Sequence, residues 1–226
     1  MRFHGINRIF YENGQIKSEE LKVKGKLHGK STRWSLNGQI REERNYRNGI
    51  KHGQWISWSS SGMKLTQSTY KDNKLHGKII QWHPDSRTKD FEGTFKNGKK
   101  DGKWIEWHDN GHIKSEVYYS EDIQNGINRS FYENGQKEQE STLNNDEIHG
   151  VQVGWYPNGQ KAFEENFIEG VSNGKFTNWH HLNGHKLSEG NYKDGNKDGK
   201  WTEWDENGQI ELEANYKDGE CISGNC

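Results

Sequence analysis

The residues of this chain that could do metal chemistry are histidines placed at a regular interval. Five of them stand directly before a glycine, and the first four are 24 residues apart: His4, His28, His52, His76 and His149. Zinc binds imidazole nitrogen at about 2.0–2.1 Å. Equivalent residues of neighbouring hairpins would lie about 10 Å apart, at two strand spacings. Two such histidines therefore do not share one ion, and we interpret them as polar turn residues.

Other candidates for chemistry are weaker. The equivalent position elsewhere holds the turn-forming residues Asp101, Asn125, Asn173 and Asp198. The cluster of His180, His181 and His185 includes a one-residue insertion before Asn183, which indicates an irregular turn before it indicates a metal site. No nucleophile motif, phosphate-binding glycine loop or paired-cysteine site occurs in the sequence. The sequence therefore predicts no catalytic residue, no metal, no cofactor and no enzyme.

Aromatic residues offer binding chemistry instead. Five residues after each boundary glycine stands an aromatic residue: Phe10, Trp34, Trp58, Trp82, Trp107, Phe131, Trp155, Trp179 and Trp204. A second apolar series follows on the next segment: Tyr46, Tyr70, Phe95, Tyr119, Leu143, Phe167, Tyr192 and Tyr216. The nine rings could form a platform for sugars or for a partner. Because every repeat needs burial, we interpret them as the structural aromatic ladder of the core.

A third set of apolar residues is uneven. It lies three residues before the ladder, on the opposite face of a regular strand, and consists of Trp55, Ile79, Trp104, Phe176 and Trp201. Other repeats have Asn7, Ser31, Asn128 and Gln152 there. Unevenness is typical of a recognition surface, so these five residues are our partner-binding candidates. The alternative, a lightly packed second face or a bulge that turns both sets inward, stays open. Under the first interpretation, alanine at Trp104 weakens partner binding with little loss of stability.

The elements that must position these residues follow from the glycines. Boundary glycines occur at 5, 29, 53, 77, 102, 126, 150, 174 and 199, and two parallel series begin at Gly14 and Gly25. A fixed period in this range indicates a repeat architecture. The third series is interrupted only by Asn73, Asp122 and Asp146, residue types that tolerate positive φ. Ser86 interrupts the second series, and we expect a looser turn there.

Each repeat reads as two strand-like segments joined by turns. Asn13-Gly14 between such segments favours a type I′ hairpin turn, and a longer turn such as Lys217–Gly219 closes the unit. We predict an all-β fold: one elongated, twisted antiparallel sheet, a meander of about nine 24-residue β-hairpins with no significant helix. A closed barrel is the main alternative. Residues 1–220 are assigned to one domain and residues 221–226 to a C-terminal tail.

Bulk properties limit the classes of function. Hydrophobic residues make up 28% and charged residues 29%, yet 10 Trp, 9 Tyr and 8 Phe against 2 Pro argue for a folded chain. The net charge of −1 gives no general attraction to nucleic acid or anionic lipid. Cys221 and Cys226 are expected to be free thiols in a loose tail. No membrane span or signal peptide is visible, so a cytoplasmic location is the default, and an export signal upstream of Met1 stays open.

Aligned in this way, the repeats resemble the MORN-repeat variant family of bacteria. The matching units are Tyr46–Gly53, Phe95–Gly102 and Tyr192–Gly199, joined to the aromatic-x-x-Asn-Gly-Gln hairpin. The resemblance covers roughly residues 4–220. It implies a label common among such proteins, the antitoxin component of a toxin–antitoxin module, whereas related repeats elsewhere are described as scaffolds or lipid-associated modules.

Two functions are therefore weighed. The first is a non-enzymatic protein-binding repeat module, an antitoxin or immunity protein that covers a nearby-encoded toxin with one sheet face. The alternative is a repeat array that binds cell-wall glycan or choline-type groups through aromatic cages, with a lipid-associated scaffold third. No nucleic acid partner is expected. Unpaired edge strands at both ends would permit end-to-end self-association.

Overall fold

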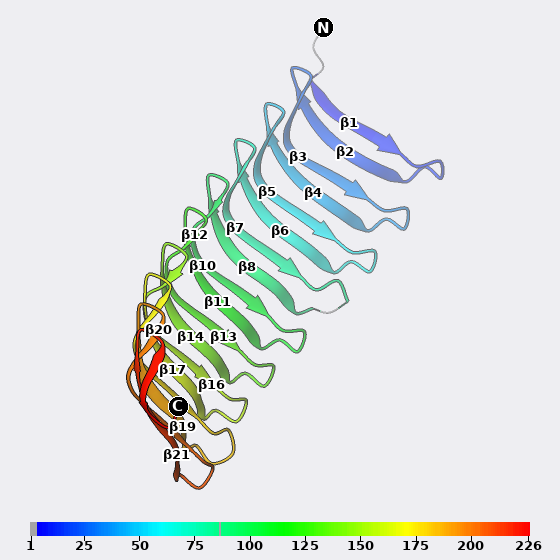
Figure 1. Cartoon of the computed structure of the whole chain (residues 1–226). Coiled ribbons are helices and arrows are strands. Elements are labelled where there is room, and N and C mark those ends of the chain that lie inside the picture. Colours follow the sequence, from blue (N-terminus) through cyan, green and yellow to red (C-terminus); the bar gives the residue numbers. More distant parts are fainter. Residues whose placement is uncertain (1–3, 86) are drawn as a thin grey trace. The chain divides into compact units, whose positions relative to one another are not determined.

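Every regular element in the described part of the chain is a β-strand. The computed structural model describes residues 4–85 and 87–226, and no α-helix occurs among them. Neighbouring strands pair antiparallel, and all 22 strands are assigned to one sheet (Figure 1). The all-β hairpin meander is therefore confirmed. The looser turn expected at Ser86 lies outside the described residues. Within the described residues, no helix has the length and apolarity to cross a bilayer.

Each repeat contributes two long strands. The first strands are β1 (Gly5–Phe10), β3 (Lys26–Trp34), β5 (Ile50–Trp58), β7 (Lys74–Trp82), β9 (Lys99–Lys100) with β10 (Gly102–Trp107), β12 (Ile123–Gln124) with β13 (Gly126–Phe131), β15 (Glu147–Ile148) with β16 (Gly150–Trp155), β18 (Val171–Trp179) and β20 (Asn196–Trp204). The second strands are β2 (Ile16–Val23), β4 (Ile40–Arg47), β6 (Lys64–Lys71), β8 (Lys89–Lys96), β11 (Ile113–Ser120), β14 (Lys137–Asn144), β17 (Lys161–Ile168), β19 (Lys186–Lys193) and β21 (Ile210–Lys217). A final strand, β22 (Glu220–Gly224), pairs with β21.

The chain divides into two compact units. One comprises residues 1–111 and 120–122, and the other comprises residues 112–119 and 123–226. Within each unit, consecutive hairpins lie side by side and pair through long strands, as β4 and β5 do in the first and β17 and β18 do in the second (Figure 1). The assignment of residues 1–220 to one domain stays a prediction.

The two kinds of turn have exchanged the roles predicted for them. At Asn13-Gly14 only the glycine has positive φ, at 82°. The Tyr11 N–H donates to the Gln15 carbonyl, and the Gly14 N–H donates to the Tyr11 carbonyl, so this is a three-residue loop that ends in a left-handed glycine. The Asn13 side chain accepts the Gln15 N–H at 3.1 Å, which holds the asparagine in the ordinary region. A type I′ turn at Asn13-Gly14 was therefore a wrong prediction.

The tight two-residue turns lie between hairpins. In Asn48-Gly49 both residues have positive φ, at 53° and 87°, as a type I′ turn requires. All positive-φ residues other than glycine in the described chain lie in turns of this series: Lys24, Asn48, Asp72, Asn73, Asn97, Glu121, Asp122, Asn145, Asp146, Glu169, Asp194 and Asp218. The left-handed geometry inferred from the third glycine series is thus present, in a shorter turn than expected.

Each of these tight turns also hydrogen-bonds to the strand that follows the preceding tight turn. The Asn73 N–H donates to the Lys51 carbonyl at 3.0 Å, and the Asn73 side chain accepts the Lys51 N–H at 2.8 Å. Asp122 and Asp146 accept the Lys100 and Gln124 N–H groups in the same way, each at 2.7 Å. A side-chain acceptor therefore offsets the cost of positive φ in the three repeats that lack glycine at this position.

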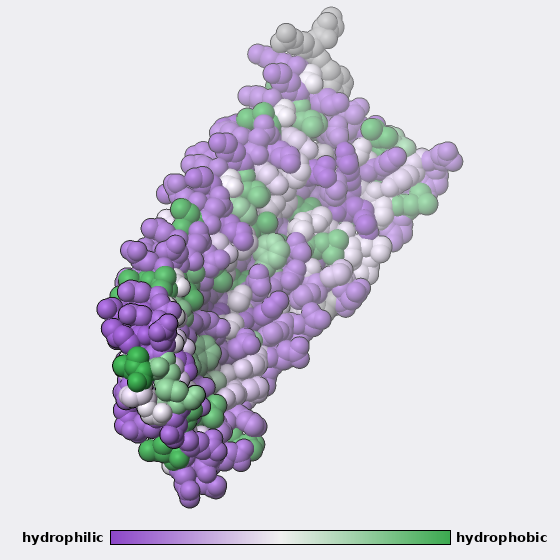
Figure 2. All heavy atoms as spheres, in the orientation of Figure 1, coloured by the Kyte–Doolittle hydropathy of each residue, from purple (hydrophilic) through white to green (hydrophobic). Residues whose placement is uncertain are grey.

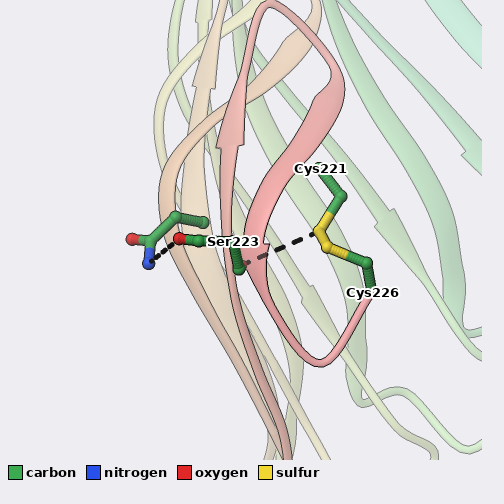
Figure 3. Close-up of a disulfide and its surroundings, with 4 residues drawn as sticks. Cys221, Ser223 and Cys226 are labelled. Carbon is green, nitrogen blue, oxygen red and sulfur yellow. Dashed lines mark hydrogen bonds between the residues drawn. A yellow bond between two sulfur atoms is a disulfide. The ribbon is translucent and has the colours of Figure 1, made fainter.

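The C-terminal residues differ from their prediction. Cys221 and Cys226 form a disulfide with their Cα atoms 5.9 Å apart, where free thiols were expected (Figure 3). The physical reason is the pairing of β22 with β21, which places Cys221 opposite Tyr216 and lets the chain turn back after Gly224. Gly224 has a φ of 95°, and a Cβ there would lie 2.3 Å from the Glu213 carbonyl oxygen.

The conformation of the tight turns can be tested at Gly98. Its φ is 92°, and an added Cβ would meet nothing closer than the Lys74 Cβ at 3.8 Å. We expect Gly98→Ala to lower the free energy of unfolding by about 1–2 kcal/mol through backbone strain alone. Gly98→Asn should cost less, because Asn73 adopts the same conformation in the repeat before. Urea unfolding of both variants measures the difference; equal losses would contradict the turn assignment.

Candidate functional site: the inner sheet face

The register of each hairpin determines which side chains share a face. In the third repeat Ser57 pairs with Thr66 and Trp58 pairs with Lys64, so Leu65 is an extra residue, a β-bulge. Trp58 therefore lies on the face opposite to Trp55 and Ser57. We call the face of Trp55 the inner face and the face of the nine-ring ladder the outer face.

Burial is concentrated on the inner face. The buried hydrophobic residues among those described are Trp104 (8% exposed), Leu143 (9%), Trp201 (2%) and Ala214 (0%), and all four occupy inner-face positions. The ladder rings from Trp34 to Trp204 are half-buried, and Phe10 is 54% exposed. The expectation that the nine ladder rings form the core was therefore wrong. The inner rings can meet rings of both neighbouring strands, and this contact is what buries them.

Trp201 shows how this packing works. Its ring stacks on Phe176 at 5.7 Å and meets the edges of Tyr192 at 5.1 Å and Tyr216 at 6.4 Å. Its Nε1 donates to the Asn191 carbonyl at 3.1 Å. The second series of apolar residues, which the sequence placed on the other strand, thus supplies the neighbours of the uneven set. In the first unit Trp104 lies against Phe91 and Phe95 in the same manner.

A signal for these two buried rings was present in the sequence. Gly93 and Gly190 belong to none of the three glycine series and have no positive φ. A Cβ added to Gly93 would lie 2.2 Å from the Trp104 ring, and one added to Gly190 would lie 2.2 Å from the Trp201 ring. A mid-strand glycine is expected where a neighbouring group approaches the backbone closely. The absence of a side chain at these two glycines therefore leaves the space in which the two tryptophan rings pack.

The five partner-binding candidates do not share one environment. Trp104 and Trp201 are buried, whereas Trp55, Ile79 and Phe176 are half-buried. Binding by these residues stays a prediction, but Trp104 and Trp201 present little surface to a partner. The two aromatic sets lie on opposite faces because side chains alternate regularly along the first strand of each hairpin. The bulge lies in the second strand, at Leu65, and Trp58 points outward opposite Lys64.

The chain's own lysines cover the inner rings. Lys51 lies 4.5 Å from the Trp55 ring centre, Lys100 lies 4.4 Å from Trp104, and Lys197 lies 4.2 Å from Trp201. These are the positions that a ligand cation would take on an aromatic ring. A choline-type group would have to displace a lysine at each of them.

The outer face is a solvated surface of paired charges. Lys137 donates to Glu140 at 3.1 Å and lies 4.7 Å from the Trp155 ring centre. The same arrangement of lysine, glutamate three residues on and next-repeat tryptophan recurs at Lys89, Lys161 and Lys186. In the one view of Figure 2, hydrophilic residues cover most of the visible surface and apolar residues form scattered spots. Such exposed pairs contribute little individually.

Grooves open on the inner face of both units. In the first unit a groove of about 610 Å³ spans the first three repeats. It is lined by Ile9, Tyr11, Lys17, Ser18, Glu20, Arg33, Arg41, Glu42, Ser57 and Leu65, together with Trp34 and Trp58, two residues of the ladder whose rings belong to the outer face. In the second unit a groove of about 300 Å³ is lined by Asn128, Ser141, Leu143 and their neighbours. Neither groove was predicted from the sequence.

The histidines behave as turn residues. Asn97 donates its backbone N–H to His76 Nδ1 at 3.3 Å, and His28 Nδ1 lies 3.3 Å from the Asn48 side chain. His180 Nε2 and His185 Nδ1 lie within hydrogen-bonding distance of two different carbonyls, those of Trp204 and Glu206. Within residues 4–85 and 87–226, no three histidine, cysteine or carboxylate side chains are grouped to hold a metal ion.

Comparison with known proteins agrees with this repeat structure. The family model described as MORN repeat variant matches residues 3–21, 27–48, 100–121, 124–145, 148–169 and 197–218, more than half of the chain. A search of curated proteins finds no match.

Similar solved structures are distant. The crystal structure of TcdB2-TccC3-Cdc42 aligns with a TM-score of 0.24 and 10% identity over 93% of this chain, and that of TcdB2-TccC3-TEV with 0.25 and 10% over 97%. The chain spans 13% and 14% of the length of those chains. These values are too low to assign a shared fold or function.

Removal of an inner ring tests where the core lies. We expect Trp201→Ala to lower the free energy of unfolding by about 3–5 kcal/mol, because it empties a buried ring site and loses a hydrogen bond. The matched control is Trp204→Ala in the same strand, whose half-buried outer ring should cost clearly less. Urea unfolding measures the free energy of unfolding of both variants. A larger loss for Trp204→Ala than for Trp201→Ala would show that the outer ladder forms the core.

The outer charge pairs predict a pH dependence. The Arg129 guanidinium, hydrogen-bonded to the Glu140 carboxylate at 2.6 Å, lowers the pKa of Glu140 below its usual 4.5, and Lys137 adds to the effect. A lowered pKa gives stability that is present above about pH 4.5 and is lost as the pH falls through the folded-state value. Glu140→Gln should flatten this part of the stability–pH curve, measured by urea unfolding from pH 6 to pH 3. Glu138→Gln, at an exposed carboxylate two residues away, should leave the curve unchanged.

Proposed function

This chain belongs to the MORN repeat variant family, and we propose that it is a non-enzymatic interaction module that binds a partner protein along its inner sheet face. The observation that carries the proposal is the uneven filling of one inner-face position. Large apolar side chains fill it in some repeats, whereas others have Asn7, Ser31, Asn128 and Gln152 there, and Asn128 lines the groove of the second unit. A surface needed only for stability would have no reason to differ from repeat to repeat.

Repeats with buried inner rings stabilise the sheet, and repeats with half-buried rings or grooves provide the binding surface. Trp104 and Trp201 are buried and hold neighbouring hairpins together, so the contact surface lies on the half-buried rings and in the grooves beside them. Trp55 and Tyr70 line a smaller groove of about 240 Å³, together with Arg44, Thr66 and Ser68. Half-buried aromatic and arginine side chains beside a recess are typical of interaction hot spots.

The specific form that we propose is an antitoxin or immunity protein acting stoichiometrically on a toxin encoded nearby. Its support is the label that proteins with such repeats commonly carry. The alternative, a glycan- or choline-binding array, is less favoured because Lys51, Lys100 and Lys197 already occupy the rings that would form its cages.

Footprinting of a complex tests the proposal. The intact chain is produced together with the product of the adjacent reading frame, and the complex is examined by size-exclusion chromatography with light scattering. Hydroxyl-radical footprinting then compares inner rings such as Trp55 and Tyr70 with outer rings such as Trp82 and Trp179. We expect a complex of fixed stoichiometry with selective protection of the inner rings.

The outcomes separate the two levels of the proposal. Protection of the outer rings alone would overturn inner-face binding. Failure of the adjacent gene product to bind, with another protein partner protecting the inner rings, would remove the antitoxin form and leave the interaction module.

A further inference from the structure

We propose that the large groove of the first three repeats binds an acidic segment of the partner protein, held in an extended polyproline-II conformation across the strands. The inference rests on the proposed function and assigns a chemistry to one part of the inner face. It is carried by the charges of the groove and by the spacing of two cations in it.

The carboxylates of the groove are already neutralised. Glu42 lies 2.7 Å from Arg44 and 3.5 Å from Arg33. Glu20 lies 3.8 Å from Lys22. Both glutamates therefore have cations of the chain beside them, and neither requires one from a ligand.

Two cations of the groove have no such partner. Among residues 4–85 and 87–226, no carboxylate lies within 4.0 Å of Lys17 or Arg41. Lys17 is exposed beside the Tyr11 ring, at 5.5 Å from its centre, and Arg41 is half-buried. The groove and its immediate neighbours thus hold more positive than negative charge, although the whole chain has a net charge of −1. This local excess is complementary to an acidic partner.

The bulges explain why these cations point into the groove. In the first three hairpins the extra residue of the second strand is Lys17, Arg41 and Leu65, in that order, and all three line the groove. A bulge re-aims a side chain from its regular position. In later hairpins the equivalent position holds Asp90, Lys114, Glu138, Ala162, Leu187 and Glu211, so no two adjacent hairpins there both have a cation. The pair of cations is therefore specific to the first two repeats.

The spacing of the two cations selects the conformation of the ligand. Equivalent positions of adjacent hairpins lie about 10 Å apart, at two strand spacings. A polyproline-II chain rises about 3.1 Å per residue and repeats every three residues, so every third side chain recurs on one side at about 9 Å. Carboxylates at every third position would therefore meet Lys17 and Arg41 together. A β-strand repeats its side chains at about 7 Å and does not match.

A protein segment fits this site better than a membrane surface. Ser18 lines the groove and is only 6% exposed, so the floor is recessed. Glu20 and Glu42 also line the groove, further along the strands that hold Lys17 and Arg41, and they would repel lipid phosphates. A narrow peptide can place its acidic groups beside Lys17 and Arg41 and avoid both carboxylates.

Titration with designed peptides tests the inference. The probe is an acetylated, amidated peptide of five Glu-Pro-Pro triplets, compared by isothermal calorimetry with the same peptide carrying Gln for Glu. Vesicles of phosphatidylcholine with one-third phosphatidylserine are the third arm. We expect binding of the Glu peptide that weakens as salt rises, with weaker binding of the Gln peptide and of the vesicles.

Variants locate the binding. Lys17→Gln and Arg41→Gln should each weaken the Glu peptide about fivefold or more, with unchanged thermal stability because neither cation is in an ion pair. The matched controls are Lys30→Gln and Lys78→Gln, which remove the same charge from the outer face, where these lysines pair with Glu43 and Glu92. The controls should retain wild-type affinity for the peptide.

Three results would overturn the inference. The first is equal binding of the Glu and Gln peptides. The second is an equal loss of affinity for the Glu peptide in the groove variants and in the outer-face controls. The third is binding of vesicles through Lys17 and Arg41 without binding of the peptide. A partner that protects the inner rings in footprinting but binds the Lys17 and Arg41 variants at full affinity would leave the proposed function standing and remove this inference alone.

Discussion

The structure depends on a repeated turn in which two consecutive residues have positive φ. Each such turn reverses the chain between hairpins, and its second residue donates an N–H to the strand that follows the preceding tight turn, as Gly49 does to the Leu27 carbonyl at 2.7 Å. A turn of this kind fixes the register of the strands that it joins. Because the side-chain period of a strand is two, a slip of one residue would exchange the inner and outer faces. The division of faces, and with it the site, therefore rests on backbone geometry.

Given that register, a single sheet must find its burial within one layer. No second sheet or helix is present among the described residues to cover either face. The inner face meets this need where a tryptophan lies flat on a neighbouring glycine, as Trp104 does on Gly93 and Trp201 on Gly190, with tyrosine or phenylalanine edges around it. On the outer face, lysine stems and glutamates partly cover the ladder rings. Few residues are fully buried as a result, and small changes on the inner face have large effects on local shape.

Because the inner face provides both the buried contacts and the grooves, stability and recognition depend on the same sheet face. A repeat that has a small or polar residue at the recurring inner position gives up a ring contact, and at Asn128 this residue lines a groove, whereas repeats with buried rings such as Trp104 supply rigidity. The residues that stabilise the sheet and the residues that are available to a partner thus lie in different repeats. The bulge in each hairpin adds a further independent position, which carries Lys17 and Arg41 in the first two repeats and Leu65 in the third. Variation at these two positions changes the surface without changing the turns.

The sequence by itself determined the repeat length, the strands, the absence of helix and the left-handed turn positions, because these depend on local residue types such as Gly49 and Asn73. The residue pattern of the repeats also identified the family. The assignment of the tight turn was reversed, because the Asn13 side chain accepts the Gln15 N–H within its own loop and because Asn73 bonds to Lys51 of the same sheet, 22 residues away. Which rings would be buried depended on contacts between strands that are ten or more residues apart, such as Trp201 with Tyr216. The closure of Cys221 to Cys226 likewise required the pairing of β22 with β21. The grooves appear only when the side chains of two or three hairpins are assembled, since each groove is lined by residues of more than one repeat.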